Sequence, residues 1–110
     1  MSHYADYLRE KTGDKIIESP SGFASYRFIN DGKSVYIVDI YVVPSERKNG
    51  MASWFANLIA EEARKAGCVE MLGTVVPSMN ESTTSLKVLL GYGFKLKSAS
   101  ENMIVFTKEL

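Results

Sequence analysis

The sequence is poor in the residues that build disulfides, metal sites and strongly charged surfaces. Its 110 residues include one cysteine, Cys68, and one histidine, His3, and its 13 Lys and Arg are balanced by 13 Asp and Glu. One cysteine excludes an internal disulfide, and His3 has no metal-ligand partner at a suitable spacing. We therefore expect no metal site. A formal net charge of zero creates no field that would recruit nucleic acid or a membrane surface.

Long apolar runs, repeats and low-complexity tracts are also missing. No stretch reaches the roughly 18 apolar residues of a membrane helix, and no secretory signal pattern is present. The hydrophobic content of 45% and the charged content of 24% are ordinary for a globular protein. Together with the unpaired cysteine, these features predict a single compact domain over residues 1–110, located in the reducing cytoplasm.

The hydrophobic pattern of the first half predicts a helix followed by three strands. The helix is expected over residues 4–11, and the strands at residues 16–17, 23–29 and 34–43. Asn30-Asp31-Gly32 is a strong hairpin signal, so the strands should form an antiparallel meander. The third strand is almost wholly β-branched or aromatic, which predicts a central strand buried on both faces.

An amphipathic helix is predicted over residues 51–66, because apolar side chains recur there at steps of three and four. We assign its Trp54 and Phe55 to the core. Gly67 stands where a left-handed C-cap belongs. The strand expected over 68–76 should lie parallel to the strand before the helix, since such crossovers are normally right-handed.

The remaining sequence predicts a polar turn over residues 78–81, a second helix and a closing hairpin. The second helix is expected to direct Leu86, Leu89 and Leu90 inward. The hairpin strands are expected over residues 94–97 and 103–107.

The segment between the third strand and the long helix is the strongest pointer to a ligand. It reads Val42-Val43-Pro44-Ser45-Glu46-Arg47-Lys48-Asn49-Gly50-Met51-Ala52. A strand, a basic turn and a helix whose first amides are unpaired together form an anion site. The Walker loop and the dinucleotide fingerprint both need more glycines than Gly50 alone. The alternative is that Gly50 only relaxes a tight connection.

This turn and the order of elements resemble the GCN5-related N-acetyltransferase (GNAT) family. Arg47-x-x-Gly50-x-Ala52 resembles its pyrophosphate turn, Ala66-Gly67-Cys68 its helix exit, and residues 89–94 its Leu-x-x-x-Gly-Phe motif. The resemblance covers about residues 16–107, without the usual first strand and much of the first helical pair. It implies an α/β (α+β) fold with a mixed, mainly antiparallel central sheet, a parallel strand pair at the cofactor cleft and helices on both faces.

The resemblance also implies which residues would hold acetyl-CoA. The backbone of Val42 and Val43 would pair with the pantetheine arm, and Asn80 or Ser82 would lie near it. Helix N-capping is the alternative role of Ser82. The residues expected around the pyrophosphate are Arg47, Lys48, Asn49, Gly50, Met51 and Ala52. For Arg47 and Lys48 the alternative is a solvated turn without a ligand.

The implied reaction is direct attack of an amine on the thioester carbonyl. Because an ordinary lysine amine has a pKa near ~10.4, a base or a water chain must take its proton. Asp39, the lone carboxylate in an apolar strand, is the candidate for the base or for positioning the water. Its structural alternative is to anchor a neighbouring loop or to pair with Arg27. Leu89 stands at the family's usual tyrosine acid position and has no proton to donate. Tyr92 is therefore the acid candidate, with packing as its alternative role.

Two functions fit these residues. The first is an acetyl-CoA-dependent N-acetyltransferase that acts on a primary amine of a small molecule or a protein. The second is a catalytically degenerate GNAT-fold module that binds coenzyme A or another protein, which Leu89 and the short N-terminal part favour. A homodimer whose partner subunit completes the acceptor wall is a further hypothesis. Nucleic acid and membranes are not expected partners.

Overall fold

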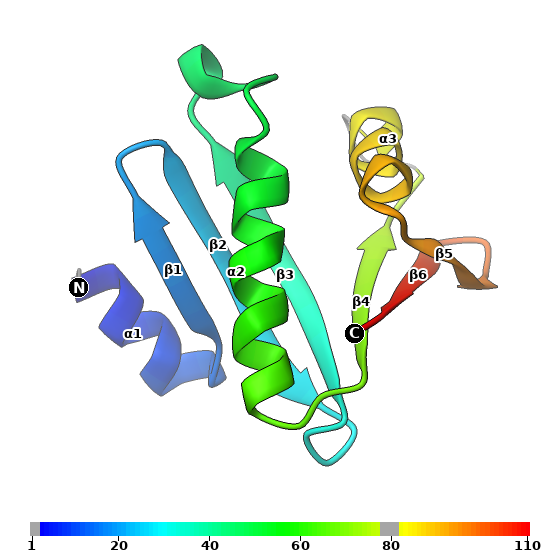
Figure 1. The fold of residues 1–110 in the computed structure, drawn as a ribbon, viewed down its shortest axis with the longest axis horizontal. Coiled ribbons are helices and arrows are strands. Elements are labelled where there is room, and N and C mark those ends of the chain that lie inside the picture. The colour runs from blue at the N-terminus through cyan, green and yellow to red at the C-terminus, as the bar shows by residue number, and fades with distance from the viewer. Residues whose placement is uncertain (1–2, 78–81) are drawn as a thin grey trace.

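The computed structural model describes residues 3–77 and 82–110 (Figure 1). The helices are α1 (His3–Thr12), α2 (Met51–Lys65) and α3 (Ser82–Tyr92), and a short 3-10 helix, η1 (Pro44–Glu46), precedes α2. The strands are β1 (Lys15–Ser19), β2 (Gly22–Ile29), β3 (Ser34–Val42), β4 (Glu70–Val75), β5 (Lys95–Ala99) and β6 (Ile104–Glu109). They form one sheet in the order β1-β2-β3-β4-β6-β5.

The sheet is mixed and mainly antiparallel, which confirms the predicted fold class. β1, β2 and β3 form the antiparallel meander, and β3 pairs with β4 in parallel. Asn30, Asp31 and Gly32 have φ angles of 54°, 57° and 78°, the left-handed turn that a tight hairpin needs. α2 crosses one face of the sheet, and α1 lies beside β1, farther from the viewer in Figure 1.

The exit from α2 is the predicted glycine cap. Gly67 has a φ of 94°, and its N–H donates to the Arg64 carbonyl at 3.1 Å. The Cys68 N–H donates to the Ala63 carbonyl at 2.9 Å. These two bonds define a Schellman motif, which satisfies carbonyls at the helix end and turns the chain into β4.

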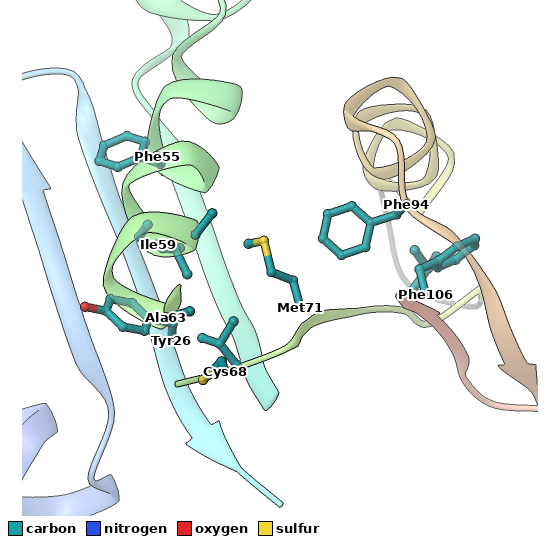
Figure 2. Close-up of a cluster of buried hydrophobic side chains, with 12 residues drawn as sticks. Tyr26, Phe55, Ile59, Ala63, Cys68, Met71, Phe94 and Phe106 are labelled. Carbon is teal, nitrogen blue, oxygen red and sulfur yellow. The ribbon is translucent and has the colours of Figure 1, made fainter. Parts of the chain in front are cut away.

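The core lies between α2, the sheet and the start of β5. Phe55, Ile59 and Ala63 are the fully buried side chains of α2. Met71 of β4 lies between these α2 side chains and Phe94, as Figure 2 shows. Met71 therefore links the α2 half of the core to the half under α3.

Three packing predictions were wrong. Trp54 is 43% exposed and Leu90 is 52% exposed, although both were assigned to the core. Each lies one residue, or about 100°, from the side chain that does pack inward, Phe55 or Leu89, so the buried stripe of each helix is narrower than its apolar stripe. β3 is not buried on both faces, because Asp39 and Tyr41 are exposed.

Candidate functional site

β3 and β4 separate after a short paired section. The parallel ladder joins Ser34–Tyr36 to Glu70–Leu72. β3 continues to Val42 and β4 to Val75, and Figure 1 shows the two strands diverging towards these ends. Among the described residues, the edge of β3 that faces β4 is therefore unpaired beyond Tyr36.

A pocket lies over this divergence, between α2 and α3. Its empty space amounts to about 300 Å³, a figure that includes open solvent at its mouth. It extends from Ala52 and Ser53 in the first turn of α2 to Tyr92 and Phe94 at the end of α3. The lining is mainly apolar and consists of Ile37, Ile40, Ala52, Ser53, Ala56, Val88, Leu89, Tyr92 and Phe94.

The connection from β3 to α2 has the geometry expected of an anion-binding turn. Lys48 and Gly50 adopt left-handed φ angles of 72° and 77°. The Trp54 N–H donates to the Gly50 carbonyl at 3.0 Å, so the amides of the three preceding residues lie outside the helical ladder. No side chain caps this helix start. Free amides and the positive end of the helix dipole therefore face the mouth of the pocket.

Arg47 donates a hydrogen bond to a backbone carbonyl at the end of β3. Its Nε donates to the Val42 carbonyl at 2.9 Å, and its Cζ lies 5.8 Å from the Tyr41 ring centroid. The Val43 N–H donates to the Ser21 carbonyl at 2.7 Å, so Val43 faces the β2 side. Because successive residues of a strand present their backbone groups to opposite edges, Val42 faces the gap. Of the two predicted backbone partners, only Val42 is directed towards β4.

The other predicted cofactor residues are placed as follows. Lys48 and Asn49 are exposed, and Asn49 donates to the Glu46 carboxylate at 3.3 Å. Met51 packs against the core, whereas Ala52 lines the pocket. Asn80 and the side chain of Ser82 lie outside the described residues, as does the side chain of Leu86.

Asp39 lies on the face of the sheet opposite the pocket. It is in register with Ser25, next to the pair Phe23 and Tyr41, whose rings stack at 5.7 Å. The neighbouring Ala24 is buried in the core on the α2 face, so alternation directs Phe23 and Ser25 away from α2. Asp39 and Tyr41 share that outer face.

A bulge in β3 produces this arrangement. Ser25 pairs with Asp39, but the next residue, Tyr26, pairs with Ile37, which leaves Val38 as an extra residue. The bulge shifts the alternation, so that Ile37 and Ile40 both line the pocket although they are three residues apart. Nothing in the sequence of the strand marks this shift.

The proposed pairing of Asp39 with Arg27 was wrong. The Nε and Nη2 atoms of Arg27 donate to the Asp14 carboxylate at 2.6 and 3.1 Å. Asp14 is buried, and this bidentate pair joins the end of α1 to β2. The carboxylate of Asp39 is exposed and is therefore accessible from solvent.

Tyr92 lines the far end of the pocket. Its hydroxyl donates to Asn57 Oδ1 at 2.5 Å, which bridges α3 and α2. Burial raises the pKa of Tyr92, a shift that the charge of Arg64 partly opposes, so the phenol is protonated near neutral pH. Leu89 also lines the pocket. Asn57 was missed from the sequence, where its only signal is its place one helical turn after Ser53 on α2.

Two further functional classes receive no support within the described part of the chain. None of its His, Cys, Asp and Glu side chains form a group of three or more that is placed to hold a metal ion. None of its helices is long and apolar enough to cross a membrane.

Comparison with known proteins agrees with this geometry. The sequence model of the acetyltransferase (GNAT) family matches residues 2–92. A protein from Desulfovibrio desulfuricans assigned to the GNAT family has a similar structure, with a TM-score of 0.78 and 13% identity over 94% of this chain and 75% of that one. No curated protein matches the chain in sequence.

Two other similar structures contain coenzyme A. A Bacillus subtilis acetyltransferase in complex with CoA has a TM-score of 0.73 and 17% identity over 96% of this chain and 83% of its own. An aminoglycoside 6'-N-acetyltransferase complexed with coenzyme A has a TM-score of 0.74 and 12% identity over 94% and 76%.

The diverging parallel pair, the uncapped start of α2 and the pocket lie together on the α2 side of the sheet. Because the family model covers most of the sequence, the chain belongs to the acetyltransferase (GNAT) family, whose cosubstrate is acetyl-CoA.

Proposed function

We propose that this chain is an acetyl-CoA-dependent N-acetyltransferase whose acceptor is a primary amine of a small molecule or a protein. One observation carries the proposal: the unpaired edge of β3, the free amides of α2 and the apolar pocket are contiguous. Acetyl-CoA has an anionic pyrophosphate, an amide-rich arm and a thioester, and these would meet the free amides, the unpaired strand edge and the apolar pocket respectively.

The cofactor residues take roles that follow from their positions. The pyrophosphate would lie at the amides of Met51 and Ala52, where the helix dipole stabilises negative charge. A side chain at Gly50 would point into open space in the free protein, so this space is available to the pyrophosphate. Arg47 would exchange the Val42 carbonyl for the pyrophosphate, which frees that carbonyl for the pantetheine arm.

The acceptor amine would approach from the outer face of the sheet, through the gap between β3 and β4. The exposed Asp39 would take a proton from the ammonium group, directly or through water. The neutral nitrogen then attacks the thioester carbonyl, a C–N bond forms and the C–S bond breaks. The thiolate leaves and takes a proton from Tyr92 or from water, and the second proton of the attacking nitrogen passes to water and restores that donor. The Tyr92 hydroxyl must first break its hydrogen bond to Asn57 before it can reach the thiolate.

Turnover tests the reaction directly. Thiol release from acetyl-CoA is followed with polyamines, amino sugars and lysine-containing peptides as acceptors. We expect Asp39→Asn to lower kcat/KM by at least ~100-fold, because general base catalysis contributes that much. Glu61→Gln, which removes an exposed carboxylate from α2, should match the wild type. Full turnover of Asp39→Asn at every pH would contradict the assignment of the base.

The second function is a degenerate module that binds coenzyme A without turnover. It is favoured by Leu89 at the usual acid position and by the bond that directs the Tyr92 proton towards Asn57. Coenzyme binding without thiol release for any amine class would select it.

We propose that a partner subunit covers the outer face at Asp39 and Tyr41, both of which are exposed in the single chain. Light scattering should then give twice the 12.2 kDa mass of the chain. A single-chain mass with intact turnover would contradict the dimer.

A further inference from the structure

A hydrogen bond from Tyr92, which lines the pocket, to Asn57 joins α3 to α2 beside the pocket. Ala52 and Ser53 line the pocket at the first turn of α2. Asn57 lies one helical turn beyond Ser53, away from the anion-binding amides. The pocket therefore has a phosphate end and a far end, and the bridge between the two helices lies at the far end.

The Tyr92 side chain is held from several directions. Its hydroxyl is bonded to Asn57, and its ring centroid lies 5.9 Å from that of the buried Phe94. The Nζ atom of Lys108 lies 5.4 Å from the same ring centroid. A ring with contacts at its edge, its face and its hydroxyl does not move aside without losing several of them.

The walls near this end suit a hydrocarbon group. Ile37, Leu89 and Phe94 are apolar, and the hydroxyl of Tyr92 is already engaged by Asn57. If the pyrophosphate occupies the amides at the start of α2, the coenzyme arm extends along the pocket and its thioester arrives near Tyr92. The acyl group is then the part of the ligand that meets this end.

We infer that the Tyr92–Asn57 bridge is the end wall of an acyl pocket and restricts the coenzyme to short acyl groups. This inference rests on the proposed function, since it requires acyl-CoA to bind in the pocket. Tyr92 and Asn57 are thus specificity-determining residues. An acetyl group fits in front of the wall, whereas a chain of six carbons collides with it.

The test compares the affinities of free CoA, acetyl-CoA and hexanoyl-CoA, measured by calorimetry. We expect the wild type to bind acetyl-CoA at least about tenfold more tightly than hexanoyl-CoA, because surplus methylenes have no room. In Tyr92→Ala the wall is removed, and the ratio should fall to about one or invert, since an apolar cavity accepts an apolar chain.

Three further variants separate the wall from general stability. Tyr92→Phe keeps the ring but loses the bridge, and Asn57→Ala removes the partner, so each should lower the ratio about threefold. Leu90→Ala changes an exposed side chain of α3 and should leave the ratio unchanged. If Tyr92→Ala does not fold, Tyr92→Phe and Asn57→Ala decide whether the bridge restricts the acyl group.

The outcomes distinguish the inference from the function on which it rests. Equal affinity of the wild type for both acyl forms, or an unchanged ratio in Asn57→Ala and Tyr92→Phe, would overturn the end wall alone. Failure of free CoA and acetyl-CoA to bind the wild type would overturn the proposed function itself.

Discussion

Among single residues, Glu70 makes the most connections between strands. Its carboxylate accepts bonds from Lys97 at 2.9 and 3.0 Å, from Thr107 at 2.7 Å and from Ser34 at 3.0 Å. The bond from Lys97 lowers the pKa of Glu70 most, followed by that from Thr107. Glu70 therefore ties β4 to β3, β5 and β6 at the closed end of the strand divergence.

This network predicts a pH-dependent stability. Because the pKa of Glu70 is lower in the folded protein, its contribution is complete well above the usual value and is lost as pH falls through the folded pKa. Glu70→Gln should lower the free energy of unfolding by about 1 kcal/mol at pH 7. The difference from the wild type should shrink as the pH falls below the ordinary glutamate pKa of about 4.3, and vanish once the pH is below the lowered pKa of folded Glu70.

Urea unfolding at several pH values measures this difference. The exposed Glu101→Gln in the β5–β6 turn is the control and should follow the wild type throughout. A difference between Glu70→Gln and the wild type that stays constant from pH 7 to pH 3 would contradict the assigned role.

The predictability of individual residues depended on whether their roles are local. Gly67 and the Asn30-Asp31-Gly32 turn were predicted because their backbone conformations are encoded in a few adjacent residues. The partner of Arg27 was not predicted, because Asp14 is brought to it by the pairing of β1 with β2. The Tyr92–Asn57 bond likewise joins residues 35 positions apart.

Among the helices and strands, the spacing between β4 and α3 determines the width of the pocket. A Cβ at Gly73 would lie 2.9 Å from Leu89 Cδ2 and 3.7 Å from Phe94 Cε2. The absence of a side chain at Gly73 thus allows Leu89 to approach the strand. A methyl group there would push Leu89 into the pocket.

Gly73→Ala should therefore lower stability by about 1 kcal/mol, because the methyl group overpacks the core, and should weaken the binding of acetyl-CoA. Gly91→Ala on α3 is the matched control, since no atom lies within 4 Å of its added Cβ. The control should be neutral or slightly stabilising, because alanine favours a helix. Thermal unfolding with and without acetyl-CoA distinguishes the two variants. Equal melting temperatures of Gly73→Ala and Gly91→Ala, with and without acetyl-CoA, would show that the contact with Leu89 does not shape the pocket.

The order and type of the elements were predictable, whereas the faces of β3 were not. The periodicity of α2 and the alternation in β2 specify each element locally. The bulge at Val38 depends on pairing with β2, and it decides that Asp39 lies on the outer face. For this reason the sequence indicated a carboxylate near the site but not the side of the sheet from which it acts.

In the whole molecule, the two candidate catalytic side chains lie on opposite faces of one sheet. Tyr92 and the pocket face α2, while Asp39 faces outward beside the stacked Phe23 and Tyr41. In the proposed mechanism, the thioester would be reached from both faces where β3 diverges from β4. The coenzyme and the acceptor would therefore enter from different sides and meet at the thioester.

We expect acetyl-CoA to bind where β3 and β4 diverge, with its pyrophosphate at the start of α2. The most direct test is the thermal unfolding of the protein with increasing acetyl-CoA. Ligand at 100 times its dissociation constant should stabilise the fold by ~2.7 kcal/mol and raise Tm by about ten degrees. The double variant Arg47→Ala, Gly50→Glu should lose this shift. An unchanged Tm of the wild type in millimolar acetyl-CoA would show that acetyl-CoA does not bind this site.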